Sequence, residues 1–261
     1  LGFLLFPLAG FGQQGGGIFN QAKATLTVAN STISDNSVVT VGGGIANNGG
    51  AVTITGSTIS GNRTDGLGGG IFNGGFPDAL GLLTMTNSTI SSNISGSAGG
   101  GIAAGGFGDT HLHNVTITNN TGATNAGSGG GVTGGMSLQN TVIAGNRDAG
   151  SGVASDCSAR LISQGYNLIQ DPDECIITGD LTGNIVGQDA QLGPLGDYGG
   201  SIPTHALLAG SPAIDAGNPA TPGRDAACAA TDQRGFLRPL GVTCDIGAFE
   251  LADSTVGFSL S

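Results

Sequence analysis

Apolar and polar residues alternate in short segments that recur at a nearly fixed interval through the first two thirds of the chain. In each copy one isoleucine lies within a polar stretch, at positions Ile33, Ile59, Ile90, Ile117 and Ile143. Successive copies are 26 to 31 residues apart. Because a strand places every second side chain on the same side, we expect each isoleucine to point inward from a short strand.

A second phrase is interleaved with the first and has a similar spacing. It consists of three glycines and an aliphatic residue, at residues 15–18, 42–45, 68–71, 99–102 and 129–132. A repeat of this length buries its apolar side by stacking on its neighbours, which is the principle of a solenoid. Abundant glycine and β-branched residues argue against helical repeats. We therefore expect an all-β parallel β-helix with an aliphatic column inside.

An asparagine follows each inward isoleucine by three residues, where the strand should end. The five are Asn36, Asn62, Asn93, Asn120 and Asn146. Asparagine tolerates the left-handed backbone of a turn, and its stacked amides can bond from one repeat to the next. We expect a structural ladder. Residues 30–32, 87–89 and 114–116 also match the glycosylation sequon, but the repeat accounts for them without a glycan.

The repeats divide the chain into three parts. Residues 1–14 form an apolar segment that is either a secretory signal remnant or a cover for the first repeat, and both interpretations stay open. Residues 15–190 should contain the β-helix repeats, and residues 191–261 a cap or anchor-like region. Alternation over 255–261 predicts one more half-buried strand.

Composition supports stacked strands and excludes some partners. The 261 residues include 52 glycines and no tryptophan. Such a composition also suits disorder, but the regular aliphatic positions argue for a packed fold. The formal net charge is -11 and Lys23 is the only lysine, so we expect no nucleic acid partner. The apolar N-terminal segment is too short to span a bilayer, and we expect no transmembrane segment.

Four cysteines follow the clear repeats, at Cys157, Cys175, Cys228 and Cys244. None shows the close Cys-x-x-Cys spacing of a zinc site, so disulfides are favoured. Of the three possible pairings we favour Cys157 with Cys175 and Cys228 with Cys244, because each closes a short loop. Disulfides indicate an oxidising compartment, and we expect an extracellular or cell-surface protein.

Two resemblances follow from these motifs. The alternation of Gly-Gly-Gly-Ile with Ile-Ser-x-Asn over about residues 15–150 resembles the repeats of bacterial right-handed parallel β-helix surface proteins, and is similar to those of chlamydial polymorphic outer-membrane proteins. The later part resembles the "choice-of-anchor Q" proteins in segments 165–169, 192–195, 203–208, 210–217, 231–235 and 244–250. The resemblance implies a secreted bacterial β-helix and supplies no catalytic residues.

Ionisable residues in the repeats do not align into an obvious catalytic centre. Arg63 and Arg147 share a column three repeats apart, which favours ordinary surface solvation. His111 and His113 should point to the same side of one strand, as metal ligands do, but no third ligand is in register. An exposed polar pair is favoured.

Two charged groups lie outside the clear repeats. Asp171, Asp173 and Glu174 lack the spacing of a known calcium loop, which favours a solvated turn. The second group is Asp215, Asp232, Arg234, Asp245 and Glu250. An internal ion-pair network that fixes the C-terminal region to the last repeat explains this group as well as catalysis does. We assign no catalytic residue and no metal site, and we expect no cofactor.

Outward threonines form two columns, one at Thr32, Thr58, Thr89 and Thr116 and one at Thr27, Thr53 and Thr84. Regular threonine faces occur in ice-binding solenoids, but the columns break at Val142 and at His111. Ordinary strand surface is favoured.

We therefore expect an exported structural or adhesive protein of the bacterial surface or matrix, or a self-assembling fibre subunit. Its expected partners are further copies of the chain, in an oligomer or an end-to-end polymer, and polysaccharides or cell-surface glycans. The alternative is a polysaccharide lyase, glycoside hydrolase or glycan-binding β-helix.

Overall fold

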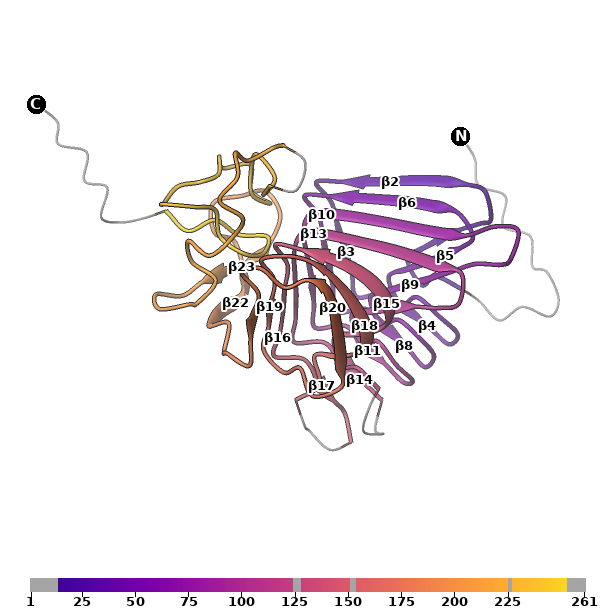
Figure 1. Cartoon of the computed structure of the whole chain (residues 1–261). Helices are drawn as coiled ribbons and strands as arrows, with labels where there is room; N and C mark the ends of the chain where they lie inside the picture. The colour runs from indigo at the N-terminus through magenta and orange to yellow at the C-terminus, as the bar shows by residue number, and fades with distance from the viewer. Residues whose placement is uncertain (1–13, 124–127, 151–153, 225–226, 253–261) are drawn as a thin grey trace, which may run out of the picture.

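A computed structural model shows the protein as an all-β chain (Figure 1). It describes residues 14–123, 128–150, 154–224 and 227–252, and no helix occurs among them. Nearly all strands pair in parallel, in sheets of sixteen, five and two strands. The segment 1–13 and the strand expected over 255–261 lie outside the described residues.

The strands are short apart from two of eleven residues. The sixteen-stranded sheet contains β1 (Ile18–Asn20), β2 (Thr25–Ala29), β3 (Thr32–Ser34), β5 (Ile45–Asn48), β6 (Ala51–Thr55), β7 (Thr58–Ser60), β9 (Ile71–Gly74), β10 (Gly81–Ser91), β12 (Ile102–Ala104), β13 (Gly108–Thr118), β15 (Val132–Gln139), β16 (Val142–Ala144), β18 (Cys157–Gln164), β19 (Leu168–Ile169), β20 (Cys175–Asp180) and β21 (Ile185–Val186). The five-stranded sheet contains β4 (Ser37–Val38), β8 (Arg63–Thr64), β11 (Ile94–Ser95), β14 (Thr121–Gly122) and β17 (Arg147–Asp148). The antiparallel pair is β22 (Leu192–Gly196) and β23 (Thr204–Leu207).

Each strand stacks on the equivalent strand of the next repeat. The inward isoleucines are in register as Ile33, Ile59, Ile90, Ile117 and Ile143. The last four are fully buried. The chain therefore returns to the same place once per repeat, an arrangement that is compatible with a parallel β-helix.

The two long strands carry the chain around a corner. The first part of β10 pairs with β6, and its last three residues pair with β7. Asn87 lies between these parts with a φ of 46°, and Asn114 of β13 has a φ of 51°. Because asparagine tolerates left-handed backbone, one residue redirects the pleat without ending the strand.

The described residues form two apolar clusters in the interior. The larger contains the isoleucine column together with side chains such as Leu83, Met85 and Leu138, and all three are buried. The smaller joins Val142 and Leu168 to side chains of the C-terminal region, among them Ile246 and Phe249. This second cluster fixes the C-terminal region to the strand stack by removing apolar surface from water.

The C-terminal region lies against one side of the stack (Figure 1). It packs over β7 and the later parts of β10 and β13, so Thr58, Thr89 and Thr116 are buried. Thr32, in the same column one repeat earlier, stays exposed. The prediction that this threonine column is ordinary strand surface is therefore wrong for Thr58, Thr89 and Thr116, which lie in an internal contact.

Candidate functional site

A ladder of asparagine side chains runs up the interior. The Nδ2 of Asn62 donates to the Oδ1 of Asn93 at 3.0 Å, and the Nδ2 of Asn93 donates to the Oδ1 of Asn120 at 2.9 Å. Asn36 and Asn146 extend the same chain of bonds at its two ends. Each acceptor amide also receives the backbone N–H of the preceding asparagine. The asparagine bonding expected from the repeat is thus present.

A second buried ladder was not expected. Asn20 donates to Asn47 at 2.9 Å, Asn47 donates to Asn73 at 2.8 Å, and Asn73 donates to the Oγ1 of Thr110 at 2.9 Å. Its sequence signal is an asparagine two residues after the aliphatic residue in the first three copies of the Gly-Gly-Gly phrase. Both ladders satisfy polar groups at buried turns, where an unpaired amide is costly.

The first ladder ends on a carboxylate. The Nδ2 of Asn146 donates to the Oδ1 of Asp156 at 2.9 Å, and the other carboxylate oxygen accepts from the N–H of Asp171 at 2.8 Å. Burial raises the pKa of Asp156 to about 6, while the hydrogen bonds from Asn146 and Asp171 oppose that change. This group therefore titrates in a mildly acidic range.

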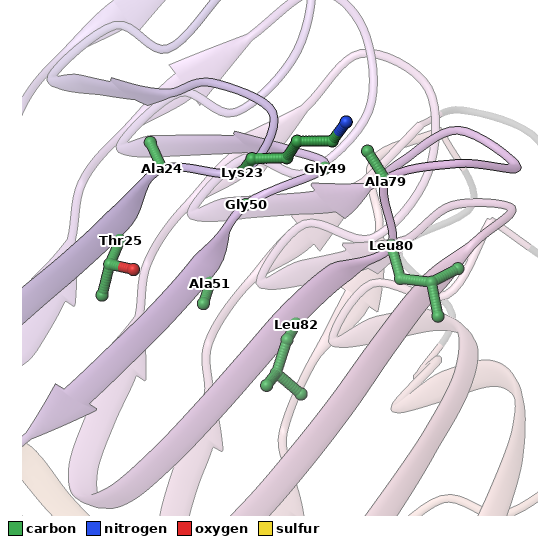
Figure 2. A pocket seen from close by; sticks show the side chains of 9 residues that line it. All are labelled: Lys23, Ala24, Thr25, Gly49, Gly50, Ala51, Ala79, Leu80 and Leu82. Carbon is green, nitrogen blue, oxygen red and sulfur yellow. The ribbon is translucent and has the colours of Figure 1, made fainter.

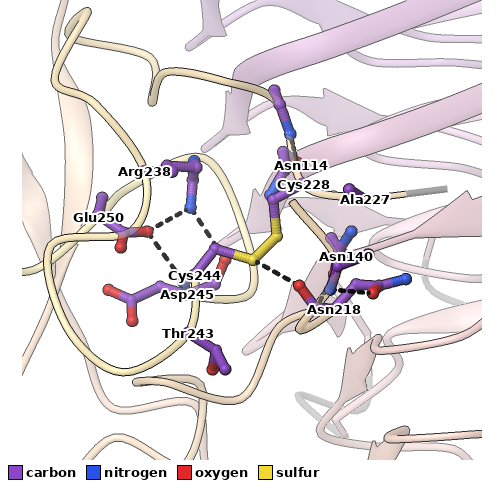
Figure 3. Close-up of a disulfide and its surroundings, with 12 residues drawn as sticks. Asn114, Asn140, Asn218, Ala227, Cys228, Arg238, Thr243, Cys244, Asp245 and Glu250 are labelled. Atoms are coloured by element: carbon purple, nitrogen blue, oxygen red, sulfur yellow. Dashed lines mark hydrogen bonds and ion pairs between the residues drawn. A yellow bond between two sulfur atoms is a disulfide. The ribbon is translucent and has the colours of Figure 1, made fainter. Parts of the chain in front are cut away.

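The four cysteines form two disulfides, Cys157–Cys175 and Cys228–Cys244, which are the favoured pairs. The first joins neighbouring strands β18 and β20. The second crosses the strand-poor C-terminal region beside buried charged residues (Figure 3). The described residues contain no free cysteine.

Buried ion pairs hold the C-terminal region together. The guanidinium of Arg238 contacts the carboxylate of Glu250 at 2.7 Å, and both side chains are fully buried (Figure 3). Arg238 also donates to the carbonyls of Asp245 and Gly247. Burial is the main cause that raises the pKa of Asp245 to about 7, and the negative charge of Glu250 is the second. Burial also raises the pKa of Glu250, against the influence of Arg238.

A second pair, Arg234 with Asp232 at 2.7 Å, lies beside the first. The Arg234 guanidinium also stacks 3.6 Å from the ring centre of Phe249. Asp232 and Arg234 were among the expected network, whereas Arg238 was not. Asp215 instead accepts hydrogen bonds from the backbone N–H groups of Val242 and Thr243.

Side chains of the C-terminal region bond across successive repeats. Gln233 bridges Thr58 and Thr89 through its amide, at 2.8 and 2.6 Å. The Nδ1–H of His205 donates to the carbonyl of Gly193 at 2.7 Å, and its Nε2 lies 2.9 Å from the hydroxyl of Ser91. Burial lowers the pKa of His205, opposed by the bond to Gly193. The network therefore links the tail to the side of the stack.

His111 and His113 have separate partners. The Nε2 of His111 lies 3.0 Å from Asp109 at an exposed position. The Nε2–H of His113 donates to the carbonyl of Ala227 at 2.7 Å, and burial lowers its pKa. The bond to that carbonyl raises the pKa of His113, and the charge of Arg238 lowers it.

The remaining candidates lie on the surface. Arg63 and Arg147 occupy one column of the five-stranded sheet, and Arg63 is 3.8 Å from Asp65. Asp171, Asp173 and Glu174 line a cavity of about 110 Å³ beside the first disulfide. Across the part of the chain that the structure describes, no three His, Cys, Asp or Glu side chains are grouped as metal ligands.

Among the described residues, β2, β6 and β10 present a regular row of exposed and half-buried side chains on their outward side. We name it the threonine face and define it as Thr25, Thr27, Thr53, Thr55, Thr84 and Thr86, all exposed or half-buried. Thr27, Thr53 and Thr84 are in register, as are Thr55 and Thr86. His111 continues the first row on β13. This surface offers ordered hydroxyl groups on a rigid support.

A cavity of about 230 Å³ opens at one end of this face (Figure 2). Lys23, Thr25, Ala51, Leu80 and Leu82 are among its lining residues. It combines an ammonium group, a hydroxyl and apolar walls, a composition suited to a small amphipathic anion.

The comparisons add no relative. No family model, no curated protein and no solved structure matches the chain. Among the described residues, no helix has the length and apolarity needed to cross a bilayer.

Proposed function

We propose that the strand stack is a right-handed parallel β-helix of an exported bacterial protein. The in-register isoleucine column and the two amide ladders support the β-helix, because both require equivalent residues to recur on one axis. The two disulfides support an oxidising location. The resemblance of the sequence to choice-of-anchor Q proteins and to polymorphic outer-membrane repeats also supports an exported β-helix.

The function that this architecture supports best is structural or adhesive, at the cell surface or in the extracellular matrix. The threonine face carries the proposal. Its hydroxyls are exposed in register, and the strands beneath are held by buried side chains such as Ile54 and Met85. A rigid surface of ordered polar groups loses little entropy when a polysaccharide binds.

A polysaccharide binding panel tests this function. The pure protein is expected to bind at least one acidic or neutral polysaccharide without releasing reducing or unsaturated ends. Replacing Thr53 and Thr84 with Glu should abolish binding, whereas Thr32→Glu, which changes an exposed threonine on another side of the stack, should retain it. Equal binding by both variants would exclude the threonine face.

The alternative function is glycan cleavage, and one pair of side chains supports it. Asp109 and His111 form an exposed pair at 3.0 Å on the strand next to the threonine face. A carboxylate that orients an imidazole is a common arrangement for proton transfer. Release of sugar fragments that is lost in His111→Asn would establish cleavage and overturn the purely adhesive proposal.

Self-assembly is the remaining part of the proposal. Among the described residues, β2 has a strand partner on one side only, and so has β20. Such edges can pair with another chain. Fibres of the full chain by electron microscopy, lost on deletion of residues 254–261, would support an end-to-end polymer. Sedimentation as a monomer at high concentration would exclude it.

A further inference from the structure

The cavity beside the threonine face exists because one corner turn is longer than its neighbours. Residues 75–80 project as a small hairpin, with N–H to carbonyl bonds in both directions between Phe76 and Ala79. The equivalent turn of the preceding repeat contains Gly49 and Gly50 and is tight. The longer turn therefore forms a wall beside the shorter ones, and the space between them is the cavity (Figure 2).

The walls of this cavity are mainly apolar. Leu80 is 60% exposed and Leu82 is 39% exposed, and Ala51 and Ala79 lie beside them. Asp78 is exposed in the same turn but is not among the lining residues. An amphipathic ligand can therefore cover apolar carbon here without burying a carboxylate of the protein.

Lys23 supplies the positive charge. Its backbone has a φ of 64°, which is unusual for a residue other than glycine, and its N–H donates to the carbonyl of Gly49 at 2.7 Å. Figure 2 shows the side chain extended across the turn toward Ala79. Within the described ranges, Lys23 has no ion-pair partner. The only lysine of a chain with net charge -11 thus stands beside an apolar cavity.

We propose that this cavity binds one uronate residue of an acidic polysaccharide. The sugar carboxylate pairs with the Lys23 ammonium, the C–H side of the ring covers Leu80 and Leu82, and a ring hydroxyl bonds to Thr25. The cavity volume of about 230 Å³ suits a single sugar ring better than a drug-sized molecule. The inference rests on the proposed adhesive function and names its ligand class.

The surroundings favour a glycan over a fatty acid, which also joins a carboxylate to apolar carbon. Thr25, Ala51 and Leu82 form one row across three strands, directly beside the row of Thr27, Thr53 and Thr84. Sugars that continue from the cavity would therefore meet hydroxyl groups. A fatty acyl chain on the same path would lie on a polar, solvated surface and lose its hydrophobic gain.

Backbone amide NMR of the labelled full chain tests the site with free monosaccharides. Glucuronate and galacturonate should shift the amides of Lys23, Ala24, Gly50, Ala51 and Leu82, whereas glucose and galactose should not. Lys23→Gln should weaken uronate binding about tenfold at low salt, since a charge-assisted contact is lost. Lys23→Arg should retain most of it.

Arg160→Gln is the matched control, because it removes one exposed positive charge from the same sheet outside the cavity. Its uronate affinity should equal that of the unmodified protein. If Arg160→Gln weakens uronate binding as much as Lys23→Gln does, the effect is one of general charge, and the proposed site is wrong. Absence of uronate shifts, or shifts with decanoate only, would overturn it as well.

The polysaccharide panel separates this inference from the adhesive function. If the chain binds polysaccharides but Lys23→Gln has no effect on uronate or polymer binding, the uronate site is wrong and adhesion stands. If free uronate binds in the cavity but no polymer is retained, the adhesive function is wrong and the site stands. Polygalacturonate and a polymer with only terminal glucuronate distinguish internal from chain-end recognition.

Discussion

Truncating the centre of the first ladder should destabilise the protein far more than truncating its end. Asn93 is fully buried, and its side chain takes part in four hydrogen bonds, to the N–H and Nδ2 of Asn62, the carbonyl of Ile59 and the Oδ1 of Asn120. Asn93→Ala removes all four. At about 1 kcal/mol each, the expected loss is roughly 4 kcal/mol of unfolding free energy.

Asn36→Ala is the control, because it makes the same substitution at the first position of the same ladder. Asn36 is half-buried and donates to the carbonyl of Ser34 and to the Oδ1 of Asn62. Water can replace part of these bonds, so we expect a loss of about 1 kcal/mol.

Urea unfolding with intact disulfides measures both variants, and the difference is read from the midpoint at constant m value. If the two variants lose the same free energy within about 0.5 kcal/mol, burial does not set the strength of the ladder bonds. The stacking of aliphatic side chains would then account for the order in the repeats.

Because burial raises the folded-state pKa of Asp156 from 3.8 to about 6, stability should fall as pH rises through this range, by about 3 kcal/mol in total and by about 2 kcal/mol between pH 4 and 6. Asp156→Asn should remove this part of the slope in urea unfolding followed against pH, and an unchanged slope would contradict the assignment. Arg238→Met leaves the buried carboxylate of Glu250 without its ion-pair partner and should cost about 3 to 5 kcal/mol, with hydrogen exchange faster in residues 227–252 than in the strand stack. Equal acceleration in both regions would show that they unfold together. Replacing Cys157 and Cys175 with Ser opens an 18-residue loop and should cost about 3 kcal/mol, measured by thermal unfolding against the oxidised protein. A loss below about 1 kcal/mol would indicate that the β18–β20 pairing holds the loop without the bond.

Features with a fixed spacing were predictable from the sequence, because one repeat specifies the next. The isoleucine column and the asparagine bonds are of this kind. The second ladder had the same kind of signal in Asn20, Asn47 and Asn73, two residues after each aliphatic position, but only the first three of the five glycine phrases carry it. The fold is therefore encoded largely in local periodicity.

Contacts between distant segments were not predictable in the same way. Alternation shows that Thr89 points outward, but only the folded tail shows that Gln233 covers it. The pair of Arg238 with Glu250 likewise depends on the path of a region without repeats. The cavity at Lys23 was predictable only in part. The longer interval between Ile59 and Ile90 indicates an inserted turn, but it does not show that the turn forms the wall of a cavity.

The C-terminal region fixes the number of repeats in the part of the stack that it covers. Gln233 and the N–H of Ala248 together reach Thr58, Thr89 and Thr116, which belong to three consecutive turns of the chain. An added turn between them would separate these bonding groups by one strand spacing, about 4.8 Å, and leave the tail out of step. Thr32 lies before the covered turns, so duplication on that side would keep every tail contact. Growth of this protein by duplication is thus permitted at its N-terminal side and blocked under the tail.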